Sequence, residues 1–193
     1  MKVLVGCEYS GVVRDAFAAA GHDAMSCDIL PSDTPGQHYQ GDIFDVIDYP
    51  WDLAILHPPC THTAVSGARH FAAKKMDGRQ QAGLSFIMRL VRRSAHITGV
   101  AIEQPISILS SHWRKPDQVI QPWQFGHGET KAIALWLKGL PPLVPTDVVD
   151  GRDARVWRMP PGPDRAKMRS RFFEGVAAAM VGQWAMTTPP GPW

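Results

Sequence analysis

The sequence predicts an α/β protein with a Rossmann-like, doubly wound and mostly parallel sheet. Short β-rich runs alternate with amphipathic helices, and several of these runs end at glycine or at an acidic residue. Parallel neighbouring strands need a crossover connection, and a helix in that connection buries one face of the sheet. The chain has 193 residues, 45% of them hydrophobic, so it can bury one substantial core. We therefore expect a single domain over residues 1–193.

The elements of the first half have clear bounds. Residues 2–5 form a β-rich run that ends at Gly6, and a helix with an apolar face follows and stops at Gly21. The later elements are expected in this order: a strand at 23–27 closed by Asp28, a strand at 51–56, an amphipathic helix at 79–94, and a strand at 99–102 that ends at Glu103.

The second half has a weaker pattern. A strand is expected at 131–137 and a final apolar helix around residues 177–184, whereas residues 141–172 show no regular pattern. We therefore expect residues 106–193 to form a loop-rich region that ends in a helix.

Composition argues against several classes of protein. The three cysteines, Cys7, Cys27 and Cys60, lack the spacing of metal ligands. No apolar run approaches the roughly 20 residues of a membrane-spanning helix, and the first residues have the pattern of a strand rather than of a signal peptide. We therefore expect a cytoplasmic protein that binds neither a metal nor a membrane.

A basic run in the second half leaves two interpretations open. The formal net charge is only +2. Cations nevertheless crowd one stretch with few acids between them: Arg152, Arg155, Arg158, Arg165, Lys167, Arg169 and Arg171. Such a run either forms a solvated face or contacts the phosphates of a nucleic acid.

Polar residues that directly follow strands indicate a nucleotide-type site, because ligands of open parallel sheets collect beyond the carboxyl ends of the strands. The loop Gly6-Cys7-Glu8-Tyr9-Ser10-Gly11 follows the first strand, and its glycines let the backbone approach a small molecule. Asp28 ends the next strand, where a carboxylate commonly accepts hydrogen bonds from ribose hydroxyls. Asp42, in Gly41-Asp42-Ile43, either lies near an adenine amino group or belongs to an ordinary turn.

Cys60 is the candidate nucleophile. Pro58 and Pro59 precede it and hold the backbone, so that the thiol is presented at the sheet edge rather than inside the core as an inert cysteine. A catalytic thiol needs nearby positive charge, which we expect from His57, His62 and Arg69. The same histidines and Cys60, with His70, allow a zinc interpretation, but the usual ligand spacings are missing.

Glu103 leaves an apolar strand just before Gln104 and Pro105. It either caps the turn or helix that starts near Ser107 or acts in catalysis. We favour catalysis, because Glu103 and Cys60 follow strands that share the same edge of the predicted sheet.

These blocks resemble, in the same order, the signature blocks of the cytosine carbon-5 DNA methyltransferases, above all the short phage-type members. The blocks are a glycine-containing cofactor loop, a Pro-Pro-Cys loop and a Glu-Asn-Val loop. Here they correspond to residues 6–11, to Pro58-Pro59-Cys60 and to Glu103-Gln104-Pro105. The resemblance covers about the first 105 residues well and is weaker at Phe125-Gly126, at Lys131 and in the closing helix.

The resemblance implies a class I S-adenosylmethionine-dependent methyltransferase in the cytoplasm, the host cytoplasm if a phage encodes it. Residues 1–105 would form the cofactor and catalytic core, and residues 106–193 the substrate side. Cys60 would be the nucleophile, and Glu103, with a raised pKa, the acid at ring nitrogen N3. The cofactor would contact Gly6, Cys7, Glu8, Tyr9, Ser10, Gly11, Asp28, Ile29, Asp42, Ile43 and Pro58. DNA would contact Pro59, Thr61, Ser66, Lys131, Arg152, Arg155 and Arg158.

The sequence also departs from the family. His57 stands where glycine usually precedes the prolines, Thr61 where glutamine usually follows the cysteine, and Gln104-Pro105 in place of Asn-Val. There is no room for a separate target-recognition domain after Lys131, so a homodimer or a partner protein is expected to supply recognition of a long site.

Three alternatives stay open. Methylation of an exocyclic amine would require an aromatic residue where Cys60 stands. A catalytically inactive protein that binds S-adenosylmethionine or nucleic acid would not need both Cys60 and Glu103. The same carbon-5 chemistry on a single-stranded nucleic acid or a free cytosine nucleotide fits the small size of the chain.

Overall fold

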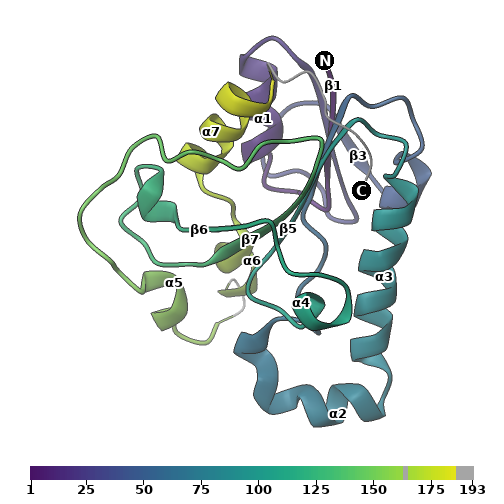
Figure 1. The fold of residues 1–193 in the computed structure, drawn as a ribbon, viewed down its shortest axis with the longest axis vertical. Coiled ribbons are helices and arrows are strands. Elements are labelled where there is room, and N and C mark those ends of the chain that lie inside the picture. Colours follow the sequence, from purple (N-terminus) through teal and green to yellow (C-terminus); the bar gives the residue numbers. More distant parts are fainter. Residues whose placement is uncertain (163–164, 186–193) are drawn as a thin grey trace.

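The computed structural model describes residues 1–162 and 165–185, with the backbone alone described at 156, 157 and 166. These residues form a seven-stranded sheet in the order β3-β2-β1-β4-β5-β7-β6, with helices on both faces (Figure 1). The strands are β1 (Lys2–Gly6), β2 (Asp23–Asp28), β3 (His38–Gln40), β4 (Leu53–Leu56), β5 (Gly99–Gln104), β6 (Gln118–Ile120) and β7 (Ile133–Lys138).

The sheet is mostly parallel. Strands β3, β2, β1, β4 and β5 run in one direction, and β7 lies antiparallel between β5 and β6. The strand order reverses between β1 and β4, which makes the carboxyl ends of these two strands the topological switch point where open α/β sheets bind their ligands. The predicted α/β fold is thus confirmed as a mostly parallel sheet compatible with a Rossmann-like arrangement.

The main helices cover the two faces of the sheet. The helices, with the 3-10 turns, are α1 (Val12–Ala19), η1 (Ile43–Asp45), η2 (Val65–His70), α2 (Phe71–Met76), α3 (Arg79–Arg93), α4 (Leu109–His112), η3 (Pro122–Gln124), α5 (Arg155–Arg158), α6 (Arg165–Ser170) and α7 (Glu174–Trp184). Helices α1 and α7 lie together on one face, and α3 lies on the other (Figure 1). The short η2–α2 segment projects away from the sheet below α3.

Each face of the sheet has its own core because successive strand residues point to opposite faces. In β1, Val3 and Val5 pack in the core that includes α1 and α7, whereas Leu4 packs in the core that includes α3. All three side chains are fully buried. This continuous burial is expected of central parallel strands, which are covered on both faces.

The second half of the chain completes the same sheet. The strand expected at 131–137 is observed as Ile133–Lys138, and it pairs with β5. Sequence periodicity did not predict the short strands β3 and β6 or the short helices α5 and α6. Of the region 106–193, residues 163–164 and 186–193 lie outside the described residues. Within the described ranges, no helix combines the length and apolar character needed to cross a membrane.

Candidate active site

The candidate site lies at the switch point, where β1, β4 and β5 end side by side. The backbone N–H of His57, just after β4, donates to the carbonyl of Gly6 at 2.8 Å. A Cβ atom at Gly6 would lie 2.7 Å from Cδ2 of Leu56 and 2.8 Å from Cδ1 of Ile43. Gly6 is therefore required for close packing here, and buried Ile43 packs against it rather than facing a ligand.

The loop that carries Cys60 is held by a buried amide. Gln104 is 1% exposed, and its Nε2 donates to the carbonyl of Pro58. Its Oε1 accepts a hydrogen bond from Oγ1 of Thr63 at 3.1 Å. The backbone N–H groups of Thr63 and Ala64 in turn donate to the carbonyl of Cys60 at 3.0 and 2.9 Å. The loop that carries Cys60 is thus fixed on both sides of this residue.

A short antiparallel bridge joins the same loop to the segment after Glu103. Ala64 pairs with Ser107, the N–H of Val65 donates to the carbonyl of Ile106, and the N–H of Ile108 donates to the carbonyl of Thr63. The two loops therefore form one structural unit. The predicted substrate residues Pro59, Thr61 and Ser66 lie on the exposed side of this unit, and Pro58 is buried beneath it.

Glu103 pairs with His57. Nδ1 of His57 lies 3.2 Å from Oε2 of Glu103, and the two side chains are only 11% and 13% exposed. The ring of Phe172 packs edge-on against the imidazole, with the ring centroids 4.9 Å apart. The second ring nitrogen of His57, Nε2, is buried without a hydrogen-bond partner in the protein.

The expected raised pKa of Glu103 is not what the structure favours. Burial raises the pKa of this carboxyl, but the hydrogen bond from His57, the charge of His57 and the charge of Lys131 together hold it below its usual range. The prediction of a raised pKa considered burial alone and missed the imidazole partner. By itself, Glu103 is therefore an ionised group at neutral pH.

The charges around Cys60 also differ from those expected. Burial and the neighbouring Glu103 raise the pKa of the thiol, while Lys131 and Arg169 lower it. Positive charge at the thiol therefore comes from Lys131 and Arg169, where we expected it from His57, His62 and Arg69. The net pKa lies above the ordinary value, so the thiol of the free protein is mostly protonated at neutral pH.

Lys131 is the predicted substrate residue that the fold brings close to Cys60 and Glu103. Its Nζ donates to the carbonyl of Arg169 at 3.0 Å and lies 5.4 Å from the centre of the Phe173 ring. The other predicted phosphate contacts, Arg152, Arg155 and Arg158, belong to a different segment. Arg155 pairs with Glu129, Arg158 lies 3.8 Å from Asp153, and Arg152 stacks 3.8 Å above the ring of Trp123.

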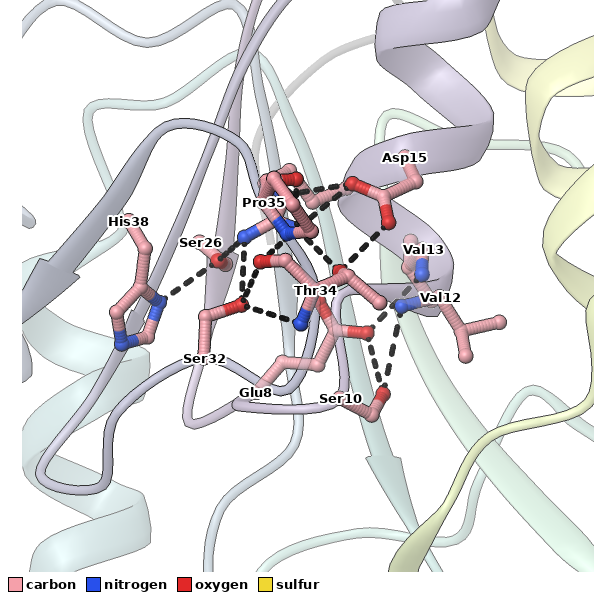
Figure 2. Close-up of polar contacts among 11 residues, drawn as sticks. Glu8, Ser10, Val12, Val13, Asp15, Ser26, Ser32, Thr34, Pro35 and His38 are labelled. Atoms are coloured by element: carbon pink, nitrogen blue, oxygen red, sulfur yellow. Dashed lines mark hydrogen bonds and ion pairs between the residues drawn. The ribbon is translucent and has the colours of Figure 1, made fainter.

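The loop between β1 and α1 contains a buried carboxylate. Oε1 of Glu8 accepts hydrogen bonds from Oγ of Ser10 at 2.9 Å and from the N–H of Val13 at 3.0 Å, so it caps α1 (Figure 2). Oε2 of the same side chain is buried without a partner in the protein. The loop begins and ends with positive φ angles, 59° at Cys7 and 76° at Gly11. The geometry thus leaves one carboxylate oxygen of Glu8 free to bind a ligand.

A buried arginine fixes the segment that follows β2. Arg14 of α1 is 1% exposed and donates to the hydroxyls of Ser26, Ser32 and Thr34. It also donates to the carbonyls of Thr34 and Pro35. The contacts around Ser26, Ser32, Thr34 and Pro35 form one network next to Glu8 and Ser10 (Figure 2). This network holds the loop after Asp28 against α1.

The remaining cofactor candidates gather at the ends of β2 and β3. Burial raises the pKa of Asp28, whose Oδ1 accepts from the N–H of Leu30 at 2.9 Å. Asp42 caps η1 by accepting from the N–H of Phe44 at 3.0 Å, which is the ordinary turn role weighed for it. Burial and then the charges of Asp28, Cys27 and Asp42 raise the pKa of the Cys7 thiol, so Cys7 lies among these groups. Ile29 is 76% exposed.

Helix α6 lies against the loop between β1 and α1. The hydroxyls of Tyr9 and Ser170 are 2.7 Å apart, and Nζ of Lys167 lies 2.6 Å from Oδ1 of Asp33. Part of the basic run therefore contacts the β1–α1 and β2–β3 loops instead of forming a free solvated face.

A cavity lies away from the candidate site. It has a volume of about 290 Å³ and lies at the opposite, amino edge of the sheet. Its walls contain none of the candidate site residues; they are formed by Met1, Asp52, Leu53, Thr98, Gly99, Gly139, Leu140 and Trp184. Within the described ranges, no group of three or more His, Cys, Asp or Glu side chains is arranged to hold a metal ion.

Sequence reasoning missed three residues of this site. Gln104 was noted only as a departure from a motif, although its position next to Glu103 could have signalled a bridge between loops. Arg14 stands out as a cation between apolar Val13 and Phe17 on a predicted helix face. Arg169 was one of many cations in the basic run, and nothing local distinguishes it.

Comparison with known proteins adds nothing to this geometry. No protein-family model matches the chain, and no curated protein matches it significantly.

Proposed function

We propose that this protein transfers a methyl group from S-adenosylmethionine to carbon 5 of cytosine in DNA, with Cys60 as nucleophile and Glu103 as acid. The observation that carries the proposal is the joint anchoring of the two residues. Cys60 and Glu103 follow or end neighbouring parallel strands, and Gln104, adjacent to Glu103, hydrogen-bonds to the loop of Cys60. Lys131 influences the pKa values of both.

The chemistry requires a residue pair of this kind. Carbon 5 of cytosine is a poor nucleophile until a thiolate adds at carbon 6 and pushes an electron pair towards N3. Cys60 would form that bond, and the positive charges of Lys131 and Arg169 would favour its thiolate. A proton donor at N3 would then stabilise the adduct, and Glu103 occupies the adjacent strand end.

The loop between β1 and α1 fits the cofactor. The buried, unpartnered Oε2 of Glu8 would accept a hydrogen bond from the ammonium group of S-adenosylmethionine, which also relieves an unpaired buried oxygen. Asp28 would accept from ribose hydroxyls at the end of β2. When bound, S-adenosylmethionine supplies the electrophilic methyl group. Asp42 already caps η1, so we propose it for contact with adenine only through its exposed side.

The positions of the basic residues suggest the size of the substrate. Lys131 and Arg169 lie at the catalytic pair, whereas Arg155 and Arg158 lie beside the carboxylates of Glu129 and Asp153. An arginine that is already paired with a carboxylate binds a phosphate more weakly than an unpaired one does. This favours, as a second candidate, the same reaction on a single-stranded nucleic acid or a cytosine nucleotide, for which no base has to be flipped from a duplex.

A product assay tests the proposal. The protein is incubated with methyl-labelled S-adenosylmethionine and duplex DNA, single-stranded DNA, RNA or dCMP, and the digested product is identified as a nucleoside. We expect 5-methylcytosine with the wild type and none with Cys60→Ser, which should keep cofactor binding. A substrate that contains 5-fluorocytosine should form a covalent adduct with the wild type only. Methylation of the exocyclic amine, or full activity of Cys60→Ser, would contradict the proposal.

A further inference from the structure

The His57–Glu103 pair poses a chemical question that the proposed function leaves open. The acid at N3 must deliver a proton, yet Glu103 accepts a hydrogen bond from Nδ1 of His57 across 3.2 Å. A carboxylate in that state holds no proton of its own to donate. The proton nearest to it is the one on His57.

We propose that His57 and Glu103 act as one proton-holding pair, in which His57 supplies through Glu103 the proton that N3 of cytosine takes when Cys60 adds to carbon 6. This inference rests on the proposed function and adds His57 to the residues that take part in the proposed reaction. His57 is a positioning and proton-supplying residue, because it acts on the substrate through Glu103.

The steps balance as follows. In the resting pair Glu103 is ionised and accepts the hydrogen bond of the Nδ1 proton of His57. As the sulfur–carbon 6 bond forms, the electron pair of the carbon 5–carbon 6 double bond shifts into the ring towards N3. Glu103 takes the Nδ1 proton of His57 and passes it to N3, while Nε2 of His57 takes a proton from a solvent molecule. Carbon 5 then takes the methyl group of S-adenosylmethionine, and S-adenosylhomocysteine is the leaving group. When the carbon-5 proton has left to solvent and the thiolate has been expelled, N3 returns its proton by the same route.

The surroundings of the imidazole suit this role. The pair is largely shielded from water by its burial and by the ring of Phe172. The charged and titratable groups that act on its carboxylate or on the neighbouring thiol are Lys131, just before β7, Arg169 of α6, and Cys60 itself. The charge of Lys131 favours an ionised Glu103 at rest, so the carboxylate can accept the Nδ1 proton of His57.

Nε2 of His57 provides the second observation. This buried nitrogen has no hydrogen-bond partner in the protein. A histidine used only as a structural tether would normally have both nitrogens satisfied, because an unpaired buried polar atom costs about 1–3 kcal/mol. A nitrogen left unpaired next to the nucleophile loop can instead gain or lose a proton through a solvent molecule that enters with the substrate.

The test compares rates over pH. His57→Asn keeps an N–H donor near the position of Nδ1. Its amide, however, does not take up or release a proton. We expect its single-turnover rate at neutral pH to fall by about 100-fold or more. The ratio of wild-type to variant rates should shrink as pH falls, by up to about tenfold per pH unit, as Glu103 takes its own proton from solvent. Loss of the Cys60 thiolate affects both proteins and cancels in this ratio. His96→Asn, at the opposite edge of the sheet, is the matched control and should not change the rate.

The outcomes separate the two proposals. A His57→Asn rate that is reduced by the same factor at every pH, or not reduced, would overturn the proton-holding role and leave the proposed function standing. Absence of methyl transfer by the wild type would overturn the proposed function itself. If His57→Asn does not fold, nitrogen-15 NMR of the wild type replaces it. Nδ1 must then carry a hydrogen-bonded proton at neutral pH, and Glu103→Gln must alter that signal; an unchanged signal would refute the pair.

Discussion

Asp28 and Glu103 hold similar places in the sheet, yet their pKa values shift in opposite directions. Each carboxylate lies at the carboxyl end of a parallel strand, β2 or β5. At Asp28 burial raises the pKa and outweighs the following backbone N–H groups and the charge of His38. At Glu103 the imidazole of His57 and the charge of Lys131 outweigh burial and lower it. The partners of a strand-end carboxylate, and not its place in the fold, decide the direction in which its pKa shifts.

The same contrast extends to the two halves of the edge. In the half formed by β1 to β3, the carboxylates accept hydrogen bonds from near neighbours in the sequence, as Glu8 does from Val13 and Asp42 from Phe44. In the half formed by β4 and β5, the carboxylate of Glu103 pairs with His57, which directly follows the neighbouring strand. The first half therefore holds its carboxylates by local caps and its loops by the buried Arg14, whereas the second half depends on pairs between strands.

The largest expected effect breaks the buried network of the first half. Arg14→Met removes the buried guanidinium that donates to Ser26, Thr34 and Pro35, so the loop after β2 loses its shared donor. We expect a loss of about 3 kcal/mol in the free energy of unfolding. For a chain of this size that corresponds to a melting temperature lower by roughly 6–12 °C in calorimetry. Arg93→Met, which removes an exposed ion pair with Asp48, is the control and should cost much less stability. Equal losses of unfolding free energy in the two variants would show that the Arg14 network stabilises the protein no more than an exposed ion pair does.

A second substitution tests the cross-strand half. Gln104→Met leaves the carbonyl of Pro58 unpaired and removes the acceptor of the Thr63 hydroxyl at 3.1 Å, which should cost about 1–3 kcal/mol. Release of the loop should also misplace Cys60 and lower turnover by up to about 100-fold. Gln118→Met is the matched control, since the side chain of Gln118, in β6, makes two hydrogen bonds to the backbone of Leu143. It should lose comparable stability in denaturant unfolding and keep turnover; a shared loss of turnover would contradict a specific role for Gln104.

Glu103→Gln should destabilise the protein at neutral pH. The pKa of Glu103 is lowered in the folded state, so its carboxylate contributes stability above the ordinary glutamate value of about 4.3. That contribution is lost as pH falls through the folded-state pKa. The difference in unfolding free energy between wild type and variant should therefore shrink below about pH 4 in urea titrations. A difference that does not change with pH would mean that charge at Glu103 has no part in stability.

Asp28→Asn should have the smallest effect and the opposite sign. A raised folded-state pKa means that the carboxylate costs stability above the ordinary aspartate value of about 3.9. The variant should be slightly more stable at neutral pH, and the gain should vanish below about pH 4. Its affinity for S-adenosylmethionine, measured by calorimetry, should fall, because an amide accepts fewer hydrogen bonds from ribose hydroxyls. If Asp28→Asn is less stable than the wild type at neutral pH, the predicted contrast between Asp28 and Glu103 is wrong.

Sequence reasoning predicted what local patterns determine. The periodicity of residues 79–94 predicted α3, which spans Arg79–Arg93, and the apolar run before Glu103 predicted β5. Strand β3 has only three residues, none of them buried, so its residues carry no apolar signal. It exists because the loop after β2 is held in place, which is a tertiary effect.

The site was predictable in its residues and not in its pairings. Cys60, Glu103 and the Gly6–Gly11 loop were proposed from their places after apolar strands. The partner of Glu103 lies 46 positions away in the sequence, and no spacing rule connects His57 to it. The pKa of Glu103 depends on that partner, so the predicted direction of its shift was wrong. Lys131 and Arg169 come together only because α6 passes close to the start of β7.

The contact of α6 with the cofactor loop has a consequence for synthesis of the chain. Tyr9 and Ser170 are separated by 161 positions, and Asp33 and Lys167 by 134. At ribosomal rates of about 5–20 residues per second, roughly 8–30 s pass between the synthesis of Tyr9 and that of Ser170. Contacts of such long range also form late in folding, because the entropy of closing the loop must be overcome first. The loop around Glu8 is thus made early and covered late, which leaves it open to chaperones and to proteolysis while the rest of the sheet assembles.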